Sequence, residues 1–484
     1  MWECIAPTAY PLDWNTALGE VMQTQDEVEF LGFVVGSRER LQQALRQWKQ
    51  LTLRERSPCV TRQRHVSKEQ GAAAGEDKTA SDVANVALLK SVKETLWVTA
   101  GPVELRSALH QLEAYVPCLQ RLMRIFQEQR TVDHFANNVR ASDSCRFAWK
   151  SGMAERRTVQ KESLLRFELV FTLFHWSMAK VRLGHEILEE FLAKSEGPTR
   201  DAVENEAVRL FREAAGILNY LSQKLCPGLI MDMDSSYYVC EVHPCVASAV
   251  SKIVMGEAYL LTIARAESQQ LSPETLMRLS LGATETFALA RAQLQGLRET
   301  HTQAAGGKKQ LEFPPEAGYA AAAELGELLC RARCFYYQAL VHEANTSPRQ
   351  TTGIRGKCIR LLEQALRELD RGRTRRLLRE GAFRFIVAPM SAKSLRHWHE
   401  LLQNKLERCQ RENDLVYLEP VPEAVPIVAA SEALYPFDPI EYAFTDSLTP
   451  HASTNGHGAE PEEPRSAAHR SMNTSSQSIG GTFR

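Results

Sequence analysis

The sequence lacks the signals that would direct it out of the cell or into a membrane. It has no basic start followed by an apolar core, and no run approaches the roughly 20 apolar residues of a transmembrane helix. A glycine at position 2 and a terminal cysteine box, the usual lipid-anchor signals, are missing too. The 11 cysteines are odd in number and follow no regular framework, which is typical of reduced thiols. We therefore expect a cytoplasmic protein.

A strong charge and the common catalytic motifs are also missing. The 58 basic and 59 acidic residues leave a net charge of -1, so the chain as a whole has no electrostatic attraction for nucleic acid. It contains no glycine-rich phosphate loop, no HExxH zinc-protease motif and no GxSxG nucleophile elbow. The segment HELLQ, from His399 to Gln403, lacks the second histidine of the zinc motif. Nothing here predicts an enzyme or a cofactor.

Two weaker constellations each keep two interpretations open. Cys240, His243 and Cys245 are soft metal ligands close together, but their spacing fits no usual zinc pattern, so buried thiols near a helix start are favoured. His175 lies inside the most apolar stretch of the chain. There a hydrogen-bonded core histidine is favoured over a pH sensor.

What the chain does contain is a hydrophobic fraction of 44%, arranged largely with helical periodicity. Residues 164–183 are apolar on nearly every face, which predicts a central helix, and the small Ala214, Ala215 and Gly216 allow a neighbouring helix to approach closely. Further helices are predicted at 204–225, 246–266, 272–297, 316–345 and 355–370. Strand signals are confined to the first 35 residues, where FLGFVV is compatible with one short strand. The expected fold is an all-α solenoid.

A series of motifs then follows along the chain. FAWK at 147–150 precedes the helix FELVFTLF at 167–174, and the alanine-rich EAVRLFREAAGILNYL at 206–221 precedes SKIVMGEAYLLTIARA at 251–266. The series closes with RENDLVYLEPVPE at 411–423. In this order the segments resemble the BRO-domain family of the ALIX, Brox and rhophilin proteins. In its length the chain is similar to the short BRO-only endosomal targeting proteins of plants and related lineages.

The resemblance implies a curved helical domain with a tetratricopeptide-like core and no cofactor. It further implies a non-catalytic adaptor, peripheral on endosomes and recruited by ESCRT-III subunits during multivesicular-body sorting. No strict 34-residue repeat is present, so a regular tetratricopeptide array is not predicted. A small-GTPase effector or cytoskeletal scaffold on the same fold is the alternative, because a fold does not fix a function. A Rho-binding hairpin or a PDZ module would favour that alternative, and the sequence shows neither.

The domain boundaries follow from the resemblance and from composition. Residues 85–445 form the BRO-like helical domain, and residues 1–55 form a poorly matched N-terminal part of it. Residues 56–84 and 446–484 break the apolar periodicity and are rich in small and polar residues. We expect a disordered insertion and a disordered tail there, because such segments bury too little apolar surface to offset the entropy of ordering.

In the family, an apolar patch on two adjacent helices receives the amphipathic C-terminal helix of the ESCRT-III partner. Transferred by position, the anchor residues of that patch fall on Thr262, Thr275 and Leu279, of which only Leu279 keeps the apolar character. Together with the neighbouring Leu276, they are the predicted partner-binding residues of this chain. Leu260 and Ile263 lie close enough in sequence to form, with Leu276, a shifted patch.

An arginine run provides a second predicted surface, for contact with an anionic endosomal membrane. Its members are Arg371, Arg373, Arg375, Arg376 and Arg379. Near a membrane such residues attract anionic headgroups at about 1 kcal/mol each. A solvated helix face is the alternative, because Glu363, Glu368, Asp370 and Glu380 lie nearby.

Tyr417, in the last motif, matches a tyrosine that can be phosphorylated in relatives. The alternative is an amphipathic anchor that ties the C-terminal segment to the helices.

Overall fold

The computed structural model describes 15 stretches of the chain, all within the unit Met1–Phe444. They are residues 33–44, 46–47, 103–129, 147–151, 153, 159–162, 164–191, 197–233, 237–303, 310–311, 315, 317–344, 353–380, 392–426 and 432–443. The predicted insertion at 56–84 and the predicted tail at 446–484 lie outside the described residues, so both stay predictions.

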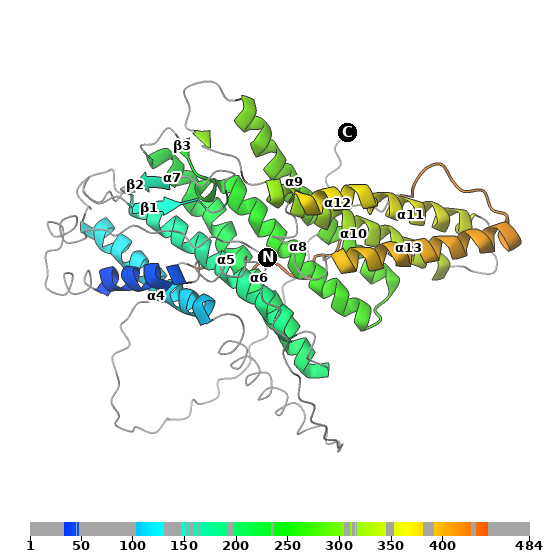
Figure 1. The fold of residues 1–484 in the computed structure, drawn as a ribbon, viewed down its shortest axis with the longest axis horizontal. Helices are drawn as coiled ribbons and strands as arrows, with labels where there is room; N and C mark the ends of the chain where they lie inside the picture. Colours follow the sequence, from blue (N-terminus) through cyan, green and yellow to red (C-terminus); the bar gives the residue numbers. More distant parts are fainter. Residues whose placement is uncertain are drawn as a thin grey trace, which may run out of the picture. The chain divides into compact units, whose positions relative to one another are not determined.

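Helices dominate the described part of the chain, which confirms the all-α class (Figure 1). The helices are α4 (Val103–Gln129), α5 (Leu165–Phe191), α6 (Gly197–Tyr220), α7 (Cys226–Asp232), α8 (Pro244–Ser268), α9 (Pro273–Gln303), α10 (Ala317–Ala344), α11 (Ile354–Glu368), α12 (Arg371–Arg379) and α13 (Ala392–Glu412). Neighbours pack in the series α4–α5–α6–α8–α9–α10–α11–α13. Each long helix thus packs mainly on the one before and the one after it, as in a helical solenoid.

The strand predictions were wrong in position. The sequence FLGFVV (30–35) was compatible with a strand, but its last three residues begin a helix, 33–44, that buries Val34, Leu41 and Ala44 at helical spacing. Residues 30–32 lie outside the described residues. FAWK is instead strand β1 (Phe147–Lys150), paired antiparallel with β2 (Val159–Glu162). A second ladder joins β3 (Tyr237–Tyr238) in parallel to β4 (Gln310–Leu311). Strands this short carry too few residues for their periodicity to be recognised in the sequence.

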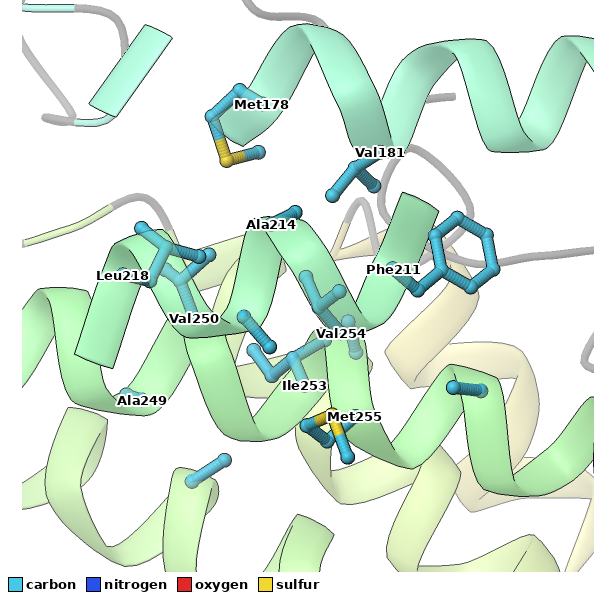
Figure 2. Close-up of a cluster of buried hydrophobic side chains, with 14 of the residues drawn as sticks. Met178, Val181, Phe211, Ala214, Leu218, Ala249, Val250, Ile253, Val254 and Met255 are labelled. Atoms are coloured by element: carbon cyan, nitrogen blue, oxygen red, sulfur yellow. The ribbon is translucent and has the colours of Figure 1, made fainter. Parts of the chain in front are cut away.

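The core lies where α5, α6 and α8 meet. Figure 2 shows Met178 and Val181 of α5 facing Ala214 and Leu218 of α6, with Val250 and its neighbours on α8 beneath them. Residues 164–183, predicted to form the central helix, are buried except for the half-buried Arg166 and Trp176, which confirms that prediction. Among the described helices, α8 is long and apolar enough to cross a membrane, but 83% of that stretch is buried inside the protein. Its apolar character is that of a core helix.

A buried carboxylate ties the N-terminal elements together. Glu168 of α5 accepts hydrogen bonds from Arg38 Nε at 2.8 Å, Tyr115 Oη at 3.1 Å and Trp149 Nε1 at 2.5 Å. These donors come from the helix at 33–44, from α4 and from β1, and all four side chains are buried. Burial and the neighbouring Glu168 raise the pKa of Tyr115. The contact explains why the FAWK and FELVFTLF motifs occur together, because Trp149 of the first binds Glu168 of the second.

After α13 the chain turns back in an extended segment, residues 419–426 and 432–443, which we call the strap. It contacts α11 first, then α9, α8 and α6, and it ends with Tyr442, whose hydroxyl accepts a hydrogen bond from Gln120 of α4 at 2.8 Å. The strap therefore crosses the helices in the reverse of their chain order.

Each of three crossings is made at a glycine. A Cβ on Gly356 would lie 2.2 Å from the carbonyl oxygen of Pro420 in the strap. A Cβ on Gly282 would lie 2.5 Å from that of Leu434, and a Cβ on Gly216 would lie 1.7 Å from that of Ile440. The sequence predicted that a neighbouring helix approaches Gly216, and this was wrong, because the strap lies against Gly216 instead. Only a residue without a side chain allows the strap backbone to lie directly on the helix.

Arginines one helical turn away from these glycines hold the strap in place. Arg278 Nε donates to the Glu432 carbonyl at 3.0 Å, while its own carbonyl accepts from Leu434 N at 3.0 Å. Arg212 repeats the arrangement with Asp438 and Ile440, at 2.8 and 3.1 Å. An Arg-x-x-x-Gly pattern on α6 and on α9 thus serves as a repeated strap-binding unit.

Candidate functional site

The four predicted partner-binding residues lie on the packed pair α8 and α9, close to the turn that joins these helices. Leu276 and Leu279 are only 6% and 5% exposed, so both belong to the core and offer little surface to a partner. Thr262 and Thr275 are half-buried. Their hydroxyls bind locally, Thr262 Oγ1 to the Ala258 carbonyl at 3.0 Å and Thr275 Oγ1 to Ser272 Oγ at 2.9 Å. The four residues thus lie on a pair of packed helices, and those that remain accessible are polar, so the partner site stays a prediction.

The shifted patch proposed from the sequence cannot form, because Leu260 and Ile263 are fully buried and Leu276 nearly so. An exposed apolar side chain is nevertheless present here, in the α8–α9 turn. Leu271 is 43% exposed. Sequence periodicity missed it because it lies outside both helices. The candidate partner surface therefore consists of Thr262, Leu271 and Thr275.

The strap borders this surface. Tyr259 of α8 donates to the Phe437 carbonyl at 3.0 Å, and Arg278 of α9 donates to the Glu432 carbonyl at 3.0 Å. Each of these side chains is three residues from Thr262 or Thr275, and residues at that spacing share a helix face. The strap thus occupies the part of the helix pair next to the candidate partner surface.

The arginine run is divided by the structure. Its helix, α12, begins at Asp370, whose carboxylate accepts from Arg373 N at 2.8 Å as an N-cap. Arg373 and Arg376 point to α10, where both pair with Glu324, at 2.8 and 3.8 Å. Arg371 and Arg375 instead line a cleft between α12 and α13, while Arg379 is exposed. Two of the five predicted membrane contacts are therefore engaged in ion pairs within the protein.

The cleft has a volume of about 350 Å³ and walls of two kinds. Its polar residues are Arg371, Thr374 and Arg375 of α12 and Arg396, His399 and Glu400 of α13. Its apolar residues are Leu369, Leu378 and Leu395. Arg396 was not singled out in the sequence, and His399 was considered only within the segment HELLQ, because both residues are distant from the arginine run along the chain. Their basic character was the only available signal.

His399 is positioned in the cleft by Arg371. The Arg371 guanidinium donates to His399 Nδ1 at 3.3 Å, so the ring proton of the neutral histidine lies on Nε2. Burial and the charge of Arg371 lower the pKa of His399. The ring is therefore a neutral hydrogen-bond donor at neutral pH.

Tyr417 closes the π-turn Asn413–Tyr417 that follows α13. It is 43% exposed, and the Arg355 guanidinium lies 5.1 Å from the centre of its ring. Asn413 fixes the turn, since its side chain binds both the amide and the carbonyl of Glu419, at 3.0 and 2.9 Å. These contacts support the anchor interpretation of Tyr417, and its phosphorylation stays a prediction. Leu415, Val416 and Leu418 are all strongly exposed beside it.

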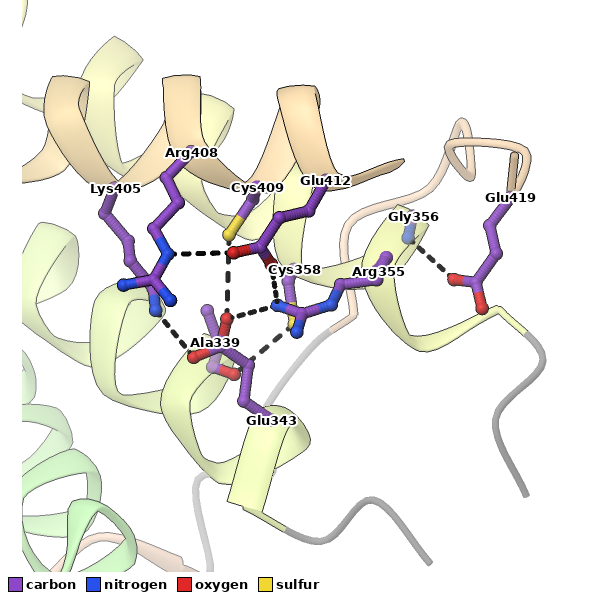
Figure 3. Close-up of polar contacts among 10 residues, drawn as sticks. All are labelled: Ala339, Glu343, Arg355, Gly356, Cys358, Lys405, Arg408, Cys409, Glu412 and Glu419. Atoms are coloured by element: carbon purple, nitrogen blue, oxygen red, sulfur yellow. Dashed lines mark hydrogen bonds and ion pairs between the residues drawn. The ribbon is translucent and has the colours of Figure 1, made fainter. Parts of the chain in front are cut away.

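Figure 3 shows the ion-pair network beneath this turn. Glu343 of α10 accepts from Arg355 of α11 and from Lys405 of α13, both at 2.7 Å. Glu412 pairs with Arg355 at 3.2 Å and with Arg408 at 2.8 Å, and the Glu419 carboxylate accepts from Gly356 N at 3.1 Å. The ion pairs join α13 to α10 and α11, and Glu419 fixes the start of the strap on α11.

The two weaker constellations have structural roles. His175 is buried and stacks on Trp149 with ring centres 5.5 Å apart, and in the described part of the chain neither ring nitrogen has a hydrogen-bond partner. Burial lowers the pKa of His175 to about 3, so the folded protein keeps it neutral at pH 5 and above. It is a core histidine, as favoured, although not a hydrogen-bonded one. His243 caps α8, its Nδ1 accepting from Cys245 N at 3.1 Å. Of the two thiols expected to be buried here, Cys240 is buried but Cys245 is exposed, so that interpretation was wrong for Cys245. The described residues contain no group of three or more metal-ligating side chains.

Comparisons with known proteins point to one family. The family model for the BRO1-like domain matches residues 77–455. The solved ALIX BRO1–CHMP4C complex is 13% identical, with a TM-score of 0.50, covering 77% of this chain and 88% of that chain. A Bro1 domain studied for endosomal targeting is 15% identical (TM-score 0.47; 75% and 84% covered), and ALIX with the SIVmac239 PYKEVTEDL late domain is 14% identical (TM-score 0.49; 77% and 45%). No curated protein matches the sequence. At 13% sequence identity, the similarity to the ALIX BRO1 structure shows a shared fold and nothing further.

Proposed function

Because the chain belongs to the BRO1-like domain family, we propose that it is a non-catalytic scaffold of endosomal sorting that binds the C-terminal helices of ESCRT-III subunits. The observation that carries the proposal is the agreement between the family match and a fold shared with ALIX BRO1, which was solved in complex with CHMP4C. The protein acts in the cytoplasm, peripheral on endosomes, where it links ESCRT-III to cargo or membrane by binding alone.

The proposed docking surface is the one formed by Thr262, Leu271 and Thr275. A helix that docks in a groove obtains most of its affinity from a few buried apolar anchors. Here Leu271 and the methyl groups of Thr262 and Thr275 supply the apolar surface area. This area is smaller than three large apolar side chains would offer. At about 25 cal/mol per Å² of buried apolar surface, we expect micromolar rather than nanomolar affinity.

Titration of the full-length chain with fluorescent C-terminal helices of the organism's ESCRT-III subunits tests this proposal. We expect micromolar binding. Thr275→Asp should weaken it at least tenfold, because the new carboxylate would be buried against the apolar face of the ESCRT-III helix. Thr275 lies in the first turn of α9, where an acidic side chain is favourable, so the fold should be retained.

Leu289→Asp is the matched control. Leu289 is an exposed leucine on the same helix, 14 positions further along, and its replacement should leave the dissociation constant unchanged. Equal weakening by both variants would contradict the assigned surface. Absence of binding at hundreds of micromolar would contradict the proposal itself and would favour a small-GTPase effector or cytoskeletal scaffold on this fold.

A further inference from the structure

The cleft between α12 and α13 presents two arginine side chains, Arg371 and Arg375, whose charges are not paired with a carboxylate in the described part of the chain. Arg371 and Arg375 are one helical turn apart and share a face of α12. Both are exposed, and in the described residues neither has a carboxylate partner. Their neighbours Arg373 and Arg376 are paired with Glu324. The same short helix therefore carries one pair of arginines that serves the fold and one pair that faces an open cleft.

The remaining walls of the cleft favour an anionic ligand. Arg396 brings a third guanidinium from α13, and among the described residues that line the cleft Glu400 is the one acidic residue. With His399 neutral, the lining carries two more positive than negative charges. The Nε2 proton of His399 adds a neutral donor, since Arg371 occupies Nδ1. Guanidinium groups bind phosphate oxygens in a bidentate manner and keep their charge at all physiological pH values.

The cleft also suits an amphiphile in size and in polarity. Its volume of about 350 Å³ lies at the small end of the range for ligand pockets. Leu369 and Leu395 are buried, and with Leu378 they give the cleft an apolar wall next to the arginines. An acidic peptide would need an elongated groove for its backbone, whereas a headgroup attached to a glycerol backbone needs one compact cationic site with an apolar side.

We infer that this cleft binds the headgroup of a membrane lipid that carries a phosphate monoester, with Arg371 and Arg375 as the phosphate ligands. His399 donates a further hydrogen bond, and the leucine wall contacts the glycerol end of the lipid. The choice of a membrane as the source of the phosphate rests on the proposed endosomal function. Membrane contact is thus assigned to a defined cleft, with Arg396 and His399 of α13 in its lining, and not to the whole arginine run.

Two double variants with the same change of charge test the site. Arg371→Gln/Arg375→Gln alters the cleft, and Arg373→Gln/Arg376→Gln alters the opposite face of the same helix. Full-length protein is sedimented with phosphatidylcholine vesicles that contain phosphatidylinositol monophosphate, or phosphatidylserine at matched total charge. We expect the first variant to bind the phosphoinositide vesicles about 30-fold more weakly, since two arginine contacts contribute about 1 kcal/mol each. The second variant should lose less than twofold, and phosphatidylserine should bind more weakly than the phosphoinositide.

Competition experiments separate recognition of the headgroup from attraction to a charged surface. Soluble inositol phosphate should compete with the vesicles if the headgroup itself is recognised. Equal losses in the two double variants, or equal binding to both lipids, would overturn the inference in favour of unspecific attraction to a negative surface. Competition by an acidic peptide but not by inositol phosphate would overturn it in favour of a protein ligand. Binding of the ESCRT-III helices should be unchanged in both variants, so failure of this inference is distinguishable from failure of the proposed function.

Discussion

Replacement of Glu168 by alanine is expected to lower the free energy of unfolding by about 3–5 kcal/mol, the range for loss of one partner from a buried ion pair. The Glu168 carboxylate is fully buried and accepts hydrogen bonds from Arg38, Tyr115 and Trp149. Without this carboxylate, the buried neutral donors Tyr115 and Trp149 lose their acceptor, and the buried guanidinium of Arg38 loses the negative charge of Glu168. An unsatisfied buried donor alone costs about 1–3 kcal/mol.

Urea unfolding followed by circular dichroism measures this change. Glu168→Gln keeps an oxygen acceptor of similar shape but not the charge, so its loss should be intermediate. Glu189→Ala, at an exposed position on the same helix, serves as the control and should change stability by less than about 0.5 kcal/mol. A single ordinary hydrogen bond contributes about 1 kcal/mol to stability. If Glu168→Ala lowers the free energy of unfolding by less than that, the network does not join the N-terminal elements to α5.

Substitution of Gly216 by alanine is expected to detach the strap from α6. The new Cβ would lie 1.7 Å from the Ile440 carbonyl oxygen and 2.8 Å from its carbon, and backbone atoms cannot yield as a flexible side chain can. Displacement of the strap breaks the two hydrogen bonds that it makes with Arg212. Overpacking of this kind typically costs about 1–3 kcal/mol.

Hydrogen exchange of the full-length chain is the suitable measurement. Residues 432–443 should lose protection in Gly216→Ala, and more strongly in the double variant with Gly282→Ala, while α5, α6 and α8 keep theirs. Gly296→Ala provides the control, because no atom lies within 4 Å of its Cβ position. There alanine should stabilise the helix by up to about 1 kcal/mol. Unchanged protection of the strap in Gly216→Ala would show that the strap is not held on the helices by close backbone contact.

The sequence predicted α5, α6 and α8 to α11 because their apolar periodicity is local, whereas α4, α7, α12 and α13 were not predicted. Residues 164–183 have apolar side chains on nearly every face, and such a helix has to be surrounded by others. The order of the motifs was also informative, since Trp149 and Glu168 prove to be hydrogen-bonded. Contacts made at a distance along the chain were not predictable in this way. Gly216 was recognised as a point of close approach, but nothing near it identifies residue 440 as its partner.

The candidate sites were predicted in part for the same reason. Position within the family pattern placed Thr262 and Thr275 on adjacent helices, and the structure keeps them there. The burial of Leu276 and Leu279 depends on how α9 is rotated against its neighbours, which a single sequence does not define. Clustering of arginines revealed Arg371 and Arg375, whereas Arg396 and His399 reach the same cleft only through the packing of α13 on the preceding helices.

The most direct test of the scaffold proposal follows the fluorescent full-length chain in cells of its own organism. We expect it to concentrate on multivesicular endosomes, to become diffuse when the ESCRT-III subunit that it binds is depleted, and to return when that subunit is restored. Thr275→Asp should fail to concentrate there, and Leu289→Asp should behave as the unmodified chain. Endosomal concentration that persists without ESCRT-III, or a diffuse distribution at all times, would contradict recruitment by ESCRT-III.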